Sequence, residues 1–554
     1  MHQFDPSPWD RRQWLRQLSI SALAGSLPQA QRSGDGARND AGARVYNIRD
    51  YGAKGDGTTL DTAAIQAAID ACHRDGGGTV LVPQGTFQTG TIELKSNVTL
   101  HVAASGRLLG SADGKQYHAI DAIPLHGDAT LEDGNWALLF AINATNVSIE
   151  GAGMIDGQGF QFHSPVRGTP PPSGLGGNRR PYLLLFYRCR NLSLRNIRLS
   201  ESAYHCVRVI QSSFIHMDGL HISNRVNSNN DGFHFISSEH VTISNCIVES
   251  QDDACALFGS CRYITVTNSS FSTRWSVFRF GGGVAENIVV SNCLLYQVYG
   301  CPIKFHGSPG SRFENISFSN LVLDDVTGPI NISLGPPLRQ ASQDLPPAAA
   351  RNISFTNIHG TVTTDPPQLP GVPFTSRYRP GEGHSCITLN CVGDATLDHI
   401  TFDNVHLIFG GGGTAEEAAR RDLPQIAGEY FILGPMPAYG LYARNVRALT
   451  LNNVRFELRQ PDLRPALIFD HVEDSAISSF SIQSNREAES ALRFIDSKDV
   501  LLTAARLLTP AAVFLQLEGN SNEKITIDGG DLSKAVTPVA CRNDALKEAV
   551  TLRC

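Results

Sequence analysis

The sequence predicts an all-β solenoid whose coils stack as a parallel β-helix. The main observation is a repeated pattern in which apolar residues alternate and an asparagine stands four residues after the first of them. Its copies are Leu192–Asn196, Val241–Asn245, Ile264–Asn268, Ile288–Asn292, Ile316–Asn320, Ile353–Asn357, Ile400–Asn404 and Leu449–Asn453. Ile215 begins a further copy that lacks the asparagine. Successive copies then start at 192, 215, 241, 264, 288 and 316, a spacing typical of one solenoid coil. The alternation and the abundance of β-branched residues indicate strands.

Strands that recur in one direction with no helices between them can pair only in parallel, so each coil is expected to stack on the next. The recurring asparagine fits a corner of such a coil. Asparagine tolerates a left-handed backbone, and its side-chain amide can form a ladder with the asparagines of neighbouring coils. We therefore predict a structural row of asparagines with no catalytic role.

The predicted β-helix spans residues 45–535 as one catalytic domain, followed by a C-terminal tail over 536–554. At its start, Asp61 to Cys72 has an amphipathic helical pattern, and we expect this helix to cap the N-terminal end of the stack. Three wide gaps between repeats predict loops, which fall in 335–347, 365–383 and 409–436. Loops of this length commonly form the walls of a binding site.

The first thirty residues have the pattern of a twin-arginine export signal. Arg11-Arg12-Gln13-Trp14-Leu15-Arg16 precedes a modest apolar stretch and a small-residue exit. Residues 31–44, rich in Gly, Ala, Asp and Asn, are predicted to form a linker. The expectation is export to the periplasm or the outside; the alternative is a basic N-terminus in which the two arginines fall together by chance.

The charge balance excludes several classes of protein. The chain has 46 Lys and Arg against 53 Asp and Glu, with a net charge of −7, so it lacks the basic stripe of a nucleic-acid-binding protein. No apolar run reaches the roughly 20 residues that span a bilayer. The twelve cysteines show no zinc-site spacing and are expected mainly as buried thiols, with Cys541 and Cys554 as a candidate disulfide. A monomer without metal or cofactor is expected.

Polar residues recur at one position on four consecutive coils. Counted back from the next repeat start, they lie 9 to 12 residues away and are predicted to form one longitudinal line: Asp231, Asp252, Asp253, Arg279, Lys304 and His306. Tyr204 and His205 extend the line by one coil, and Asn331 continues it. Clustered carboxylates repel one another unless a proton, a metal or a substrate relieves the clash, which is the setting for acid–base catalysis. The alternative is a solvated acidic strip with counter-charges.

Neighbouring residues of a regular strand point to opposite faces, so Asp252 and Asp253 can both reach one site only at a corner of the coil.

The sequence Asn229-Asn230-Asp231-Gly232-Phe233, followed by Gln251-Asp252-Asp253 and Ile303-Lys304, resembles glycoside hydrolase family 28. This is the family of polygalacturonases and rhamnogalacturonases, within the pectate-lyase-like superfamily. The opening Tyr46 to Gly57 is similar to the start of the same group.

The resemblance implies a right-handed parallel β-helix that cleaves glycosidic bonds with inversion. It makes Asp252 the general acid, and Asp231 with Asp253 the groups that position and deprotonate water. It also places Lys304 against an acid group of the substrate, and puts Asn229 and His205 among the substrate-binding residues.

Two departures from the family pattern predict an altered sugar preference. The family's Gly-His-Gly motif should lie between Asp253 and Lys304, yet residues 272–281 contain no histidine. Pro302 replaces the arginine of the family's Arg-Ile-Lys motif. Arg274, Arg279 and His306 are candidates to supply the missing contacts.

These residues are compatible with three functions. The first is an exported inverting glycoside hydrolase acting on pectin-type plant polysaccharide. The second is a Ca²⁺-dependent polysaccharide lyase in which the three aspartates hold the ion and Lys304 or Arg279 removes a proton. The third is a non-catalytic carbohydrate-binding solenoid that stacks sugars on Trp275, Tyr296 or Tyr299.

Overall fold

The computed structural model describes residues 43–118, 120, 123, 136–162, 180–336, 345–365 and 382–553. The predicted export signal, nearly all of the linker, most of the loops 335–347 and 365–383, and Cys554 lie outside the described residues. The chain separates into residues 1–40 and 41–554, and the second part is described here.

The described residues fold mainly into short strands, with few helices. The helices are η1 Ile48–Tyr51, α2 Thr62–Arg74, η2 Gly114–Gln116, η3 Gly159–Phe162, α3 Ala415–Ala418 and η4 Lys547–Ala549. The first strands are β1 Val45–Asn47, β2 Asp56–Leu60, β3 Gly78–Val82, β4 Gly85–Thr89, β5 Ile92–Glu93, β6 Val98–Val102, β7 Gly106–Gly110, β8 Ala137–Ile142, β9 Thr145–Glu150 and β10 Met154–Asp156.

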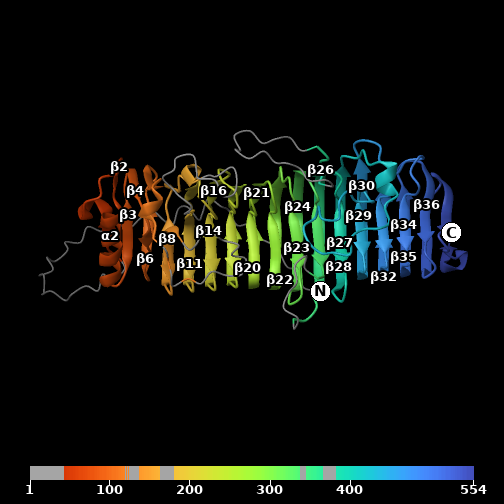
Figure 1. Cartoon of the computed structure of the whole chain (residues 1–554), viewed down its shortest axis with the longest axis horizontal. Coiled ribbons are helices and arrows are strands. Elements are labelled where there is room, and N and C mark those ends of the chain that lie inside the picture. Colours follow the sequence, from red (N-terminus) through yellow and green to blue (C-terminus); the bar gives the residue numbers. More distant parts are fainter. Residues whose placement is uncertain are drawn as a thin grey trace, which may run out of the picture. The chain divides into compact units, whose positions relative to one another are not determined.

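The central and C-terminal coils continue the same series (Figure 1). The central strands are β11 Tyr182–Tyr187, β12 Arg190–Arg195, β13 Arg198–Ser200, β14 Val207–Ile210, β15 Ser213–Asp218, β16 His221–Asn224, β17 Phe233–Ile236, β18 Glu239–Ser244, β19 Ile247–Ser250, β20 Cys255–Thr267, β21 Ser270–Thr273, β22 Phe278–Tyr296, β23 Ile303–Gly307, β24 Arg312–Val326, β25 Ile330–Leu334 and β26 Ala349–Val362. The last strands are β27 Ile387–Cys391, β28 Thr396–Phe409, β29 Leu441–Arg444, β30 Arg447–Leu458, β31 Leu467–Asp470, β32 Glu473–Ser478, β33 Ser481–Ile482, β34 Leu492–Ile495, β35 Lys498–Leu507, β36 Ala511–Glu518, β37 Glu523–Asp531, β38 Ala535–Arg542 and β39 Val550–Arg553.

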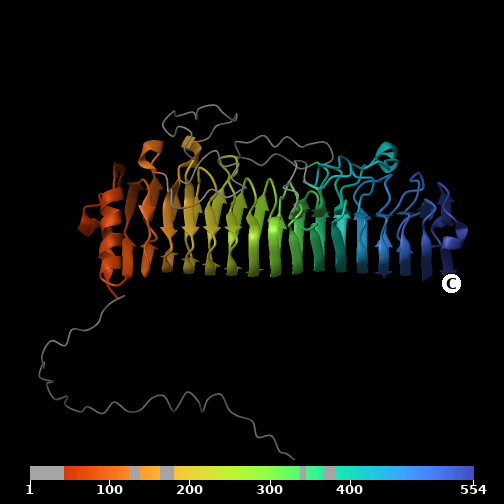
Figure 2. The ribbon, with the colours of Figure 1, turned by 60° about the horizontal axis from the view of Figure 1, so that its bottom comes forward.

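The architecture is the predicted right-handed parallel β-helix. The strands join one sheet, and each pairs in parallel with the corresponding strand of the next coil, as β14 does with β17 and β17 with β20. Such strands lie about 4.8 Å apart. In Figure 2 the strands of successive coils lie side by side, and the loops between them gather along one side of the stack.

Alternating residues fill the interior of each coil. In β18, for example, Val241 and Ile243 are buried while their neighbours are partly exposed. Aromatic side chains stack from coil to coil inside the helix, with ring centroids 4.1 Å apart for Phe280 and Phe305 and 4.9 Å apart for Phe355 and Phe402. This continuous apolar interior is what fixes the register of the strands.

The predicted cap helix is confirmed as α2. Its apolar face buries Ile65, Ala68, Ile69 and Cys72 against the first coil, and it ends just before Gly76. Asp61, immediately before the helix, accepts hydrogen bonds from the backbone N–H groups of Lys54 and Gly55. The carboxylate thereby ties the preceding loop to the start of the cap.

The predicted asparagine row is confirmed in its backbone conformation throughout, because Asn196, Asn245 and Asn268 are left-handed too, and as a side-chain ladder over its last five members. Asn292, Asn320, Asn357, Asn404 and Asn453 have left-handed backbones, with φ between 50° and 56°. The side-chain Nδ2 of each later residue donates to Oδ1 of the preceding one, at 3.0, 3.0, 2.8 and 2.9 Å. The amides thus form the ladder that the repeat predicted.

The predicted C-terminal tail over 536–554 is wrong. Its described residues, up to Arg553, continue the solenoid, because β38 pairs with β36 and β39 pairs with β37. The sequence missed them because their exposed faces weaken the apolar alternation.

Ten cysteines are buried thiols, as expected; Cys541 is half-buried, and its predicted partner lies outside the described residues. Among the helices described, none combines the length and apolarity needed to cross a bilayer.

Candidate active site

Strand pairing sets the position of the polar residues. Across β14, β17, β20, β22, β23 and β25 one register row runs through Arg208, His234, Ala256, Arg279, Lys304 and Asn331. A second row lies in the turns that precede these strands, where backbone hydrogen bonds stack His205, Asp231 and Asp253. The Cys206 N–H donates to the backbone carbonyl of Asp231, and the Gly232 N–H donates to the backbone carbonyl of Asp253. Residues of one row point to the same side of the sheet.

The predicted single line is therefore wrong in detail, because the polar residues form two rows. The aspartates belong to the turns, whereas Arg279 and Lys304 lie three positions further along, inside strands. His306 lies two positions beyond Lys304 and pairs with Gly281. The prediction placed each residue by its distance before the next repeat. That distance differs from coil to coil, because the segment before the next repeat varies and the pairing of β20 with β22 shifts register at Phe258/Gly259.

Asp231 is buried and held by histidines. Its Oδ2 accepts a hydrogen bond from His234 Nδ1 at 2.7 Å, and its Oδ1 lies 3.6 Å from His205 Nε2. Burial raises the pKa of Asp231 to about 6, although the hydrogen bond from His234 opposes this rise; the charge of Asp253 adds to it. Asp231 can therefore take up a proton near neutral pH.

The histidine tautomers follow from the surrounding donors. Arg208 Nη1 donates to His205 Nδ1 at 3.1 Å, so the proton of neutral His205 sits on Nε2, facing Asp231. Burial lowers the pKa of His205 well below its usual value, and the charges of His234 and Arg208 lower it further. The His205 and His234 rings stack with centroids 4.3 Å apart. Asp231 thus has a hydrogen bond from His234, and the Nε2 proton of neutral His205 faces it at 3.6 Å.

Asp252 lies at the corner before β20 and is only partly buried. Its Oδ1 accepts from the Asp253 N–H at 2.9 Å, and Asn229 Nδ2 lies 3.4 Å from its Oδ2. Its pKa is raised well above the usual range by burial first and then by the charges of Asp231 and Asp253, with Lys304 acting in the opposite direction. Asp252 therefore keeps its proton where an ordinary carboxyl would have lost it.

Asp253 completes the corner. It is buried, and its Oδ1 accepts from the Ser276 N–H at 3.3 Å. The sequence required a corner for Asp252 and Asp253 to serve one site, and the structure places both in the bend between β19 and β20. The charge of each acts on Asp231 or Asp252, so the three carboxyl groups form one electrostatic unit.

The cationic residues have an acidic partner that the sequence did not reveal. Lys304 is completely buried, and its Nζ donates to Glu429 Oε2 at 2.6 Å. Arg279 Nη2 lies 3.3 Å from Glu429 Oε1 and 3.2 Å from His306 Nδ1. Burial lowers the pKa of His306 to about 4, with Arg279 contributing, so this histidine is neutral.

The other two predicted binding residues, Asn229 and Arg274, have different surroundings from each other. Asn229, exposed and in a left-handed conformation, lies at Asp252. The guanidinium of Arg274 is 3.2 Å from the buried carboxylate of Glu382 and also donates to the Tyr299 carbonyl. Arg274 thus anchors other parts of the chain. Its expected role in replacing a substrate contact gains no support.

One group of side chains in the described part of the chain has the spacing of a metal site. The ligand atoms of His205, Asp231 and His234 lie within 4.8 Å of one another. The donor set does not suit Ca²⁺, which takes oxygen ligands. Arg208 also holds His205 from the far side of its ring, which opposes a bound cation. The three aspartates do not form such a group, so the expected calcium cluster of the lyase hypothesis gains no support.

Sequence reasoning missed His234, Arg208 and Glu429. His234 had a usable signal, since it lies three residues after Asp231 at a strand position that carries Arg279 two coils further on. Glu429 had none, because it lies in a loop 125 residues from Lys304 with no repeat to align it.

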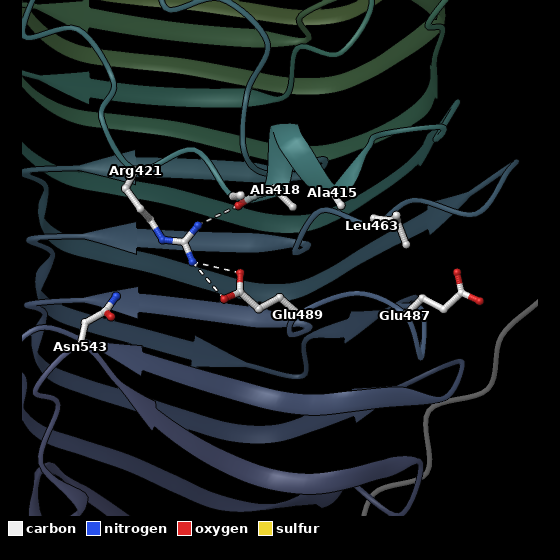
Figure 3. Close-up of a pocket in the computed structure, with 8 residues that line it drawn as sticks. Ala415, Ala418, Arg421, Leu463, Glu487, Glu489 and Asn543 are labelled. Carbon is white, nitrogen blue, oxygen red and sulfur yellow. Dashed lines mark hydrogen bonds and ion pairs between the residues drawn. The ribbon is translucent and has the colours of Figure 1, made fainter.

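A separate cavity of about 430 Å³ lies among the last coils (Figure 3). It is lined by Ala415, Ala418, Ala419, Arg421, Leu463, Glu487, Glu489 and Asn543. Arg421 there donates to the Ala418 carbonyl at 2.9 Å and pairs with Glu489 at 3.0 Å. The cavity contains none of the predicted site residues, and two of its charged groups, Arg421 and Glu489, pair with each other.

Comparison with known proteins completes the description of the site. Residues 72–369 match the family model described as glycosyl hydrolases family 28. An exo-poly-alpha-D-galacturonosidase of Dickeya chrysanthemi is 24% identical over 439 residues, covering 65% of this chain and 71% of that protein. A probable polygalacturonase of Vitis vinifera is 33% identical over 224 residues, 39% of this chain and 44% of that one. The family 28 exopolygalacturonase of Yersinia enterocolitica shares the fold, with a TM-score of 0.57 at 20% identity and 78% coverage of both chains.

Proposed function

The chain belongs to glycosyl hydrolase family 28, and from that premise we propose that it hydrolyses pectin-type polysaccharides with inversion at the anomeric carbon. As a member of this family it is a glycoside hydrolase. The relatives named for polygalacturonan cleavage support a pectic substrate. The observation that carries the mechanism is the difference in pKa between two carboxyl groups. The pKa of Asp252 is raised well above the usual range, so Asp252 keeps its proton, whereas the pKa of Asp231 is about 6, so Asp231 ionises near neutral pH.

In this proposal Asp252 donates its proton to the leaving glycosidic oxygen as the carbon–oxygen bond breaks. A water molecule attacks the opposite face of the sugar and gives its proton to Asp231, with Asp253 helping to hold the water. Inverting hydrolases need one protonated and one ionised carboxyl group with room for water between them. The hydrogen bond from His234 favours the ionised form of Asp231 that this role requires.

The proposal includes export of the enzyme through the twin-arginine motif in residues 1–30, which fits a polymeric substrate that cells degrade outside the cytoplasm. It also includes an altered sugar preference, supported by the missing histidine in 272–281 and by Pro302. No cofactor is invoked, since the proposed steps are proton transfers among carboxyl groups and water.

Product analysis tests this function. On a panel of pectic polymers and rhamnosides, we expect new reducing ends, no unsaturated uronide absorbance, and no effect of a chelator. NMR of the first product should show the inverted anomer. Unsaturated products that vanish with chelator would overturn the proposal in favour of the calcium-dependent lyase; binding without any cleavage would favour the carbohydrate-binding alternative.

The pH profile provides a second test. Asp231 must be ionised to accept a proton, so kcat should rise with pH through a midpoint near 6, the pKa of this residue. His234→Phe keeps a ring in the stack but removes the hydrogen bond that lowers this pKa. The pKa should rise, and the acid limb should move up by about one pH unit.

The matched control is His240→Phe, because His240 is an exposed histidine stacked between the rings of Phe214 and Tyr263, away from the aspartates. It should leave the profile unchanged. An acid limb that stays in place in His234→Phe would show that Asp231 is not the base that the profile reports.

A further inference from the structure

The loop between α3 and β29 places one carboxylate against two buried cations. Glu429 in this loop bridges Lys304 at 2.6 Å and Arg279 at 3.3 Å. These two cations are direct register partners on β22 and β23, so their side chains lie on one face. Burial alone would raise the pKa of Glu429, but the charges of Lys304 and Arg279 outweigh it and lower the pKa to about 2. The carboxylate is therefore ionised throughout the working pH range.

The position of Glu429 is fixed by the surrounding backbone. The N–H of Gly428, immediately before it, donates to Ser333 Oγ at 3.1 Å, and Asn390 Nδ2 donates to the Ile426 carbonyl at 2.9 Å. After it, the ring of Phe431 lies 5.9 Å from that of Trp275, the same indole over which Lys304 Nζ stands at 4.6 Å. Contacts on both sides of Glu429 thus hold its carboxylate in place.

This cluster adjoins the reacting groups. The charge of Lys304 acts on Asp252, the proposed acid, and Arg279 shares its row with His234. An anionic sugar bound beside Asp252 would seek these two cations as its counter-charges. Both are already engaged by Glu429, and displacing it would break a short charge-assisted hydrogen bond. A substrate carboxylate that left Glu429 in place would face like-charge repulsion.

Two hydrogen-bond donors in the same row nevertheless have no acceptor in the described part of the chain. Among the described residues, Arg279 Nη1 and Asn331 Nδ2 are buried nitrogens with no hydrogen-bond acceptor. They flank Lys304 on the coils before and after it. Buried donors of this kind call for an acceptor, which a sugar hydroxyl or an ester carbonyl oxygen supplies without adding charge.

We propose that Glu429 determines the sugar specificity of this site: it takes the place of a substrate carboxylate against Lys304 and Arg279, so that the sugar unit bound beside Asp252 carries no free acid group. This unit is a neutral sugar or an esterified uronate. The inference rests on the proposed function, because it assumes that a pectic chain binds across Asp252.

Binding measurements test the inference without requiring turnover. In the full-length Asp252→Asn protein, calorimetry compares galacturonate oligomers with their methyl esters at equal chain length. The ester should bind at least about ten-fold more tightly, a difference of about 1.4 kcal/mol. Adding Glu429→Gln should strengthen binding of the acid oligomer about ten-fold or more, while the ester changes less than about three-fold.

Glu416→Gln is the matched control, since it removes an exposed carboxylate from α3, which precedes the same loop in the chain, and should leave both affinities unchanged. Tighter binding of the acid oligomer while Glu429 is intact would overturn the inference, as would an unchanged preference in Glu429→Gln. If Glu429→Gln does not fold, the preference of the parent protein decides. Failure to bind either oligomer would overturn the proposed pectic substrate as well, whereas acid preference would overturn the specificity role alone.

Discussion

Asp252→Asn is expected to reduce kcat by at least about 1,000-fold while leaving the β-helix intact. Asparagine has the shape of aspartate but cannot deliver a proton to the leaving oxygen. Its side-chain oxygen can still accept from the Asp253 N–H, as Oδ1 of Asp252 does at 2.9 Å. The substitution also removes a carboxyl group whose charged form is repelled by Asp231 and Asp253, so the folded state should lose no stability.

The measurement is the initial rate of reducing-end release, together with thermal unfolding of the same preparation. Asp324→Asn is the control, because Asp324 is an exposed aspartate of β24 on the same solenoid. It should retain full activity. An Asp252→Asn variant that keeps more than a tenth of the wild-type rate would contradict the role of general acid.

Arg464→Leu is expected to destabilise the C-terminal coils by about 3–5 kcal/mol, since it leaves a buried carboxylate unpaired. Arg464 and Asp462 are both almost completely buried, and the guanidinium forks onto the carboxylate at 3.0 and 2.7 Å. The same guanidinium donates to the backbone carbonyls of His384 and Met436 at 2.8 and 3.3 Å. It therefore anchors the end of the loop that carries Glu429.

Thermal unfolding and hydrogen exchange measure this effect, and exchange should accelerate most between residues 413 and 440. Arg459→Leu, which removes an exposed arginine from the same region, should change stability by less than about 0.5 kcal/mol. Replacing Asp462 by Leu together with Arg464 should recover part of the loss, because no charge is then left buried. A loss below about 1 kcal/mol in Arg464→Leu would show that the ion pair is not needed.

The parts of the fold that repeat could be predicted from the sequence. A coil and its neighbour obey the same geometric constraints, so Asn320 and Asn357 fall at one corner in both the pattern and the structure. The three aspartates could be found for the same reason, since each sits at a coil's turn. The exact alignment could not, because the length of the connections between strands varies from coil to coil and shifts the count.

Contacts between the coils and the long loops were beyond the reach of sequence reasoning. The partner of Lys304 is Glu429, and the partner of Arg274 is Glu382; each pair joins segments more than a hundred residues apart. Such partners depend on how a loop folds back, which no period encodes. These contacts changed the interpretation most, by turning an expected anion-binding lysine into one half of an internal ion pair.

The asparagine ladder gives the solenoid an electrical polarity along its axis. From Asn292 to Asn453 each side chain donates toward the preceding coil and accepts from the following one. The amide dipoles therefore align head to tail and add, as peptide dipoles do in an α-helix. Because hydrogen-bonded amides polarise one another, each link should strengthen the next. A parallel sheet with little net dipole of its own thus acquires a directional row, positive toward its N-terminal coils and negative toward its C-terminal coils.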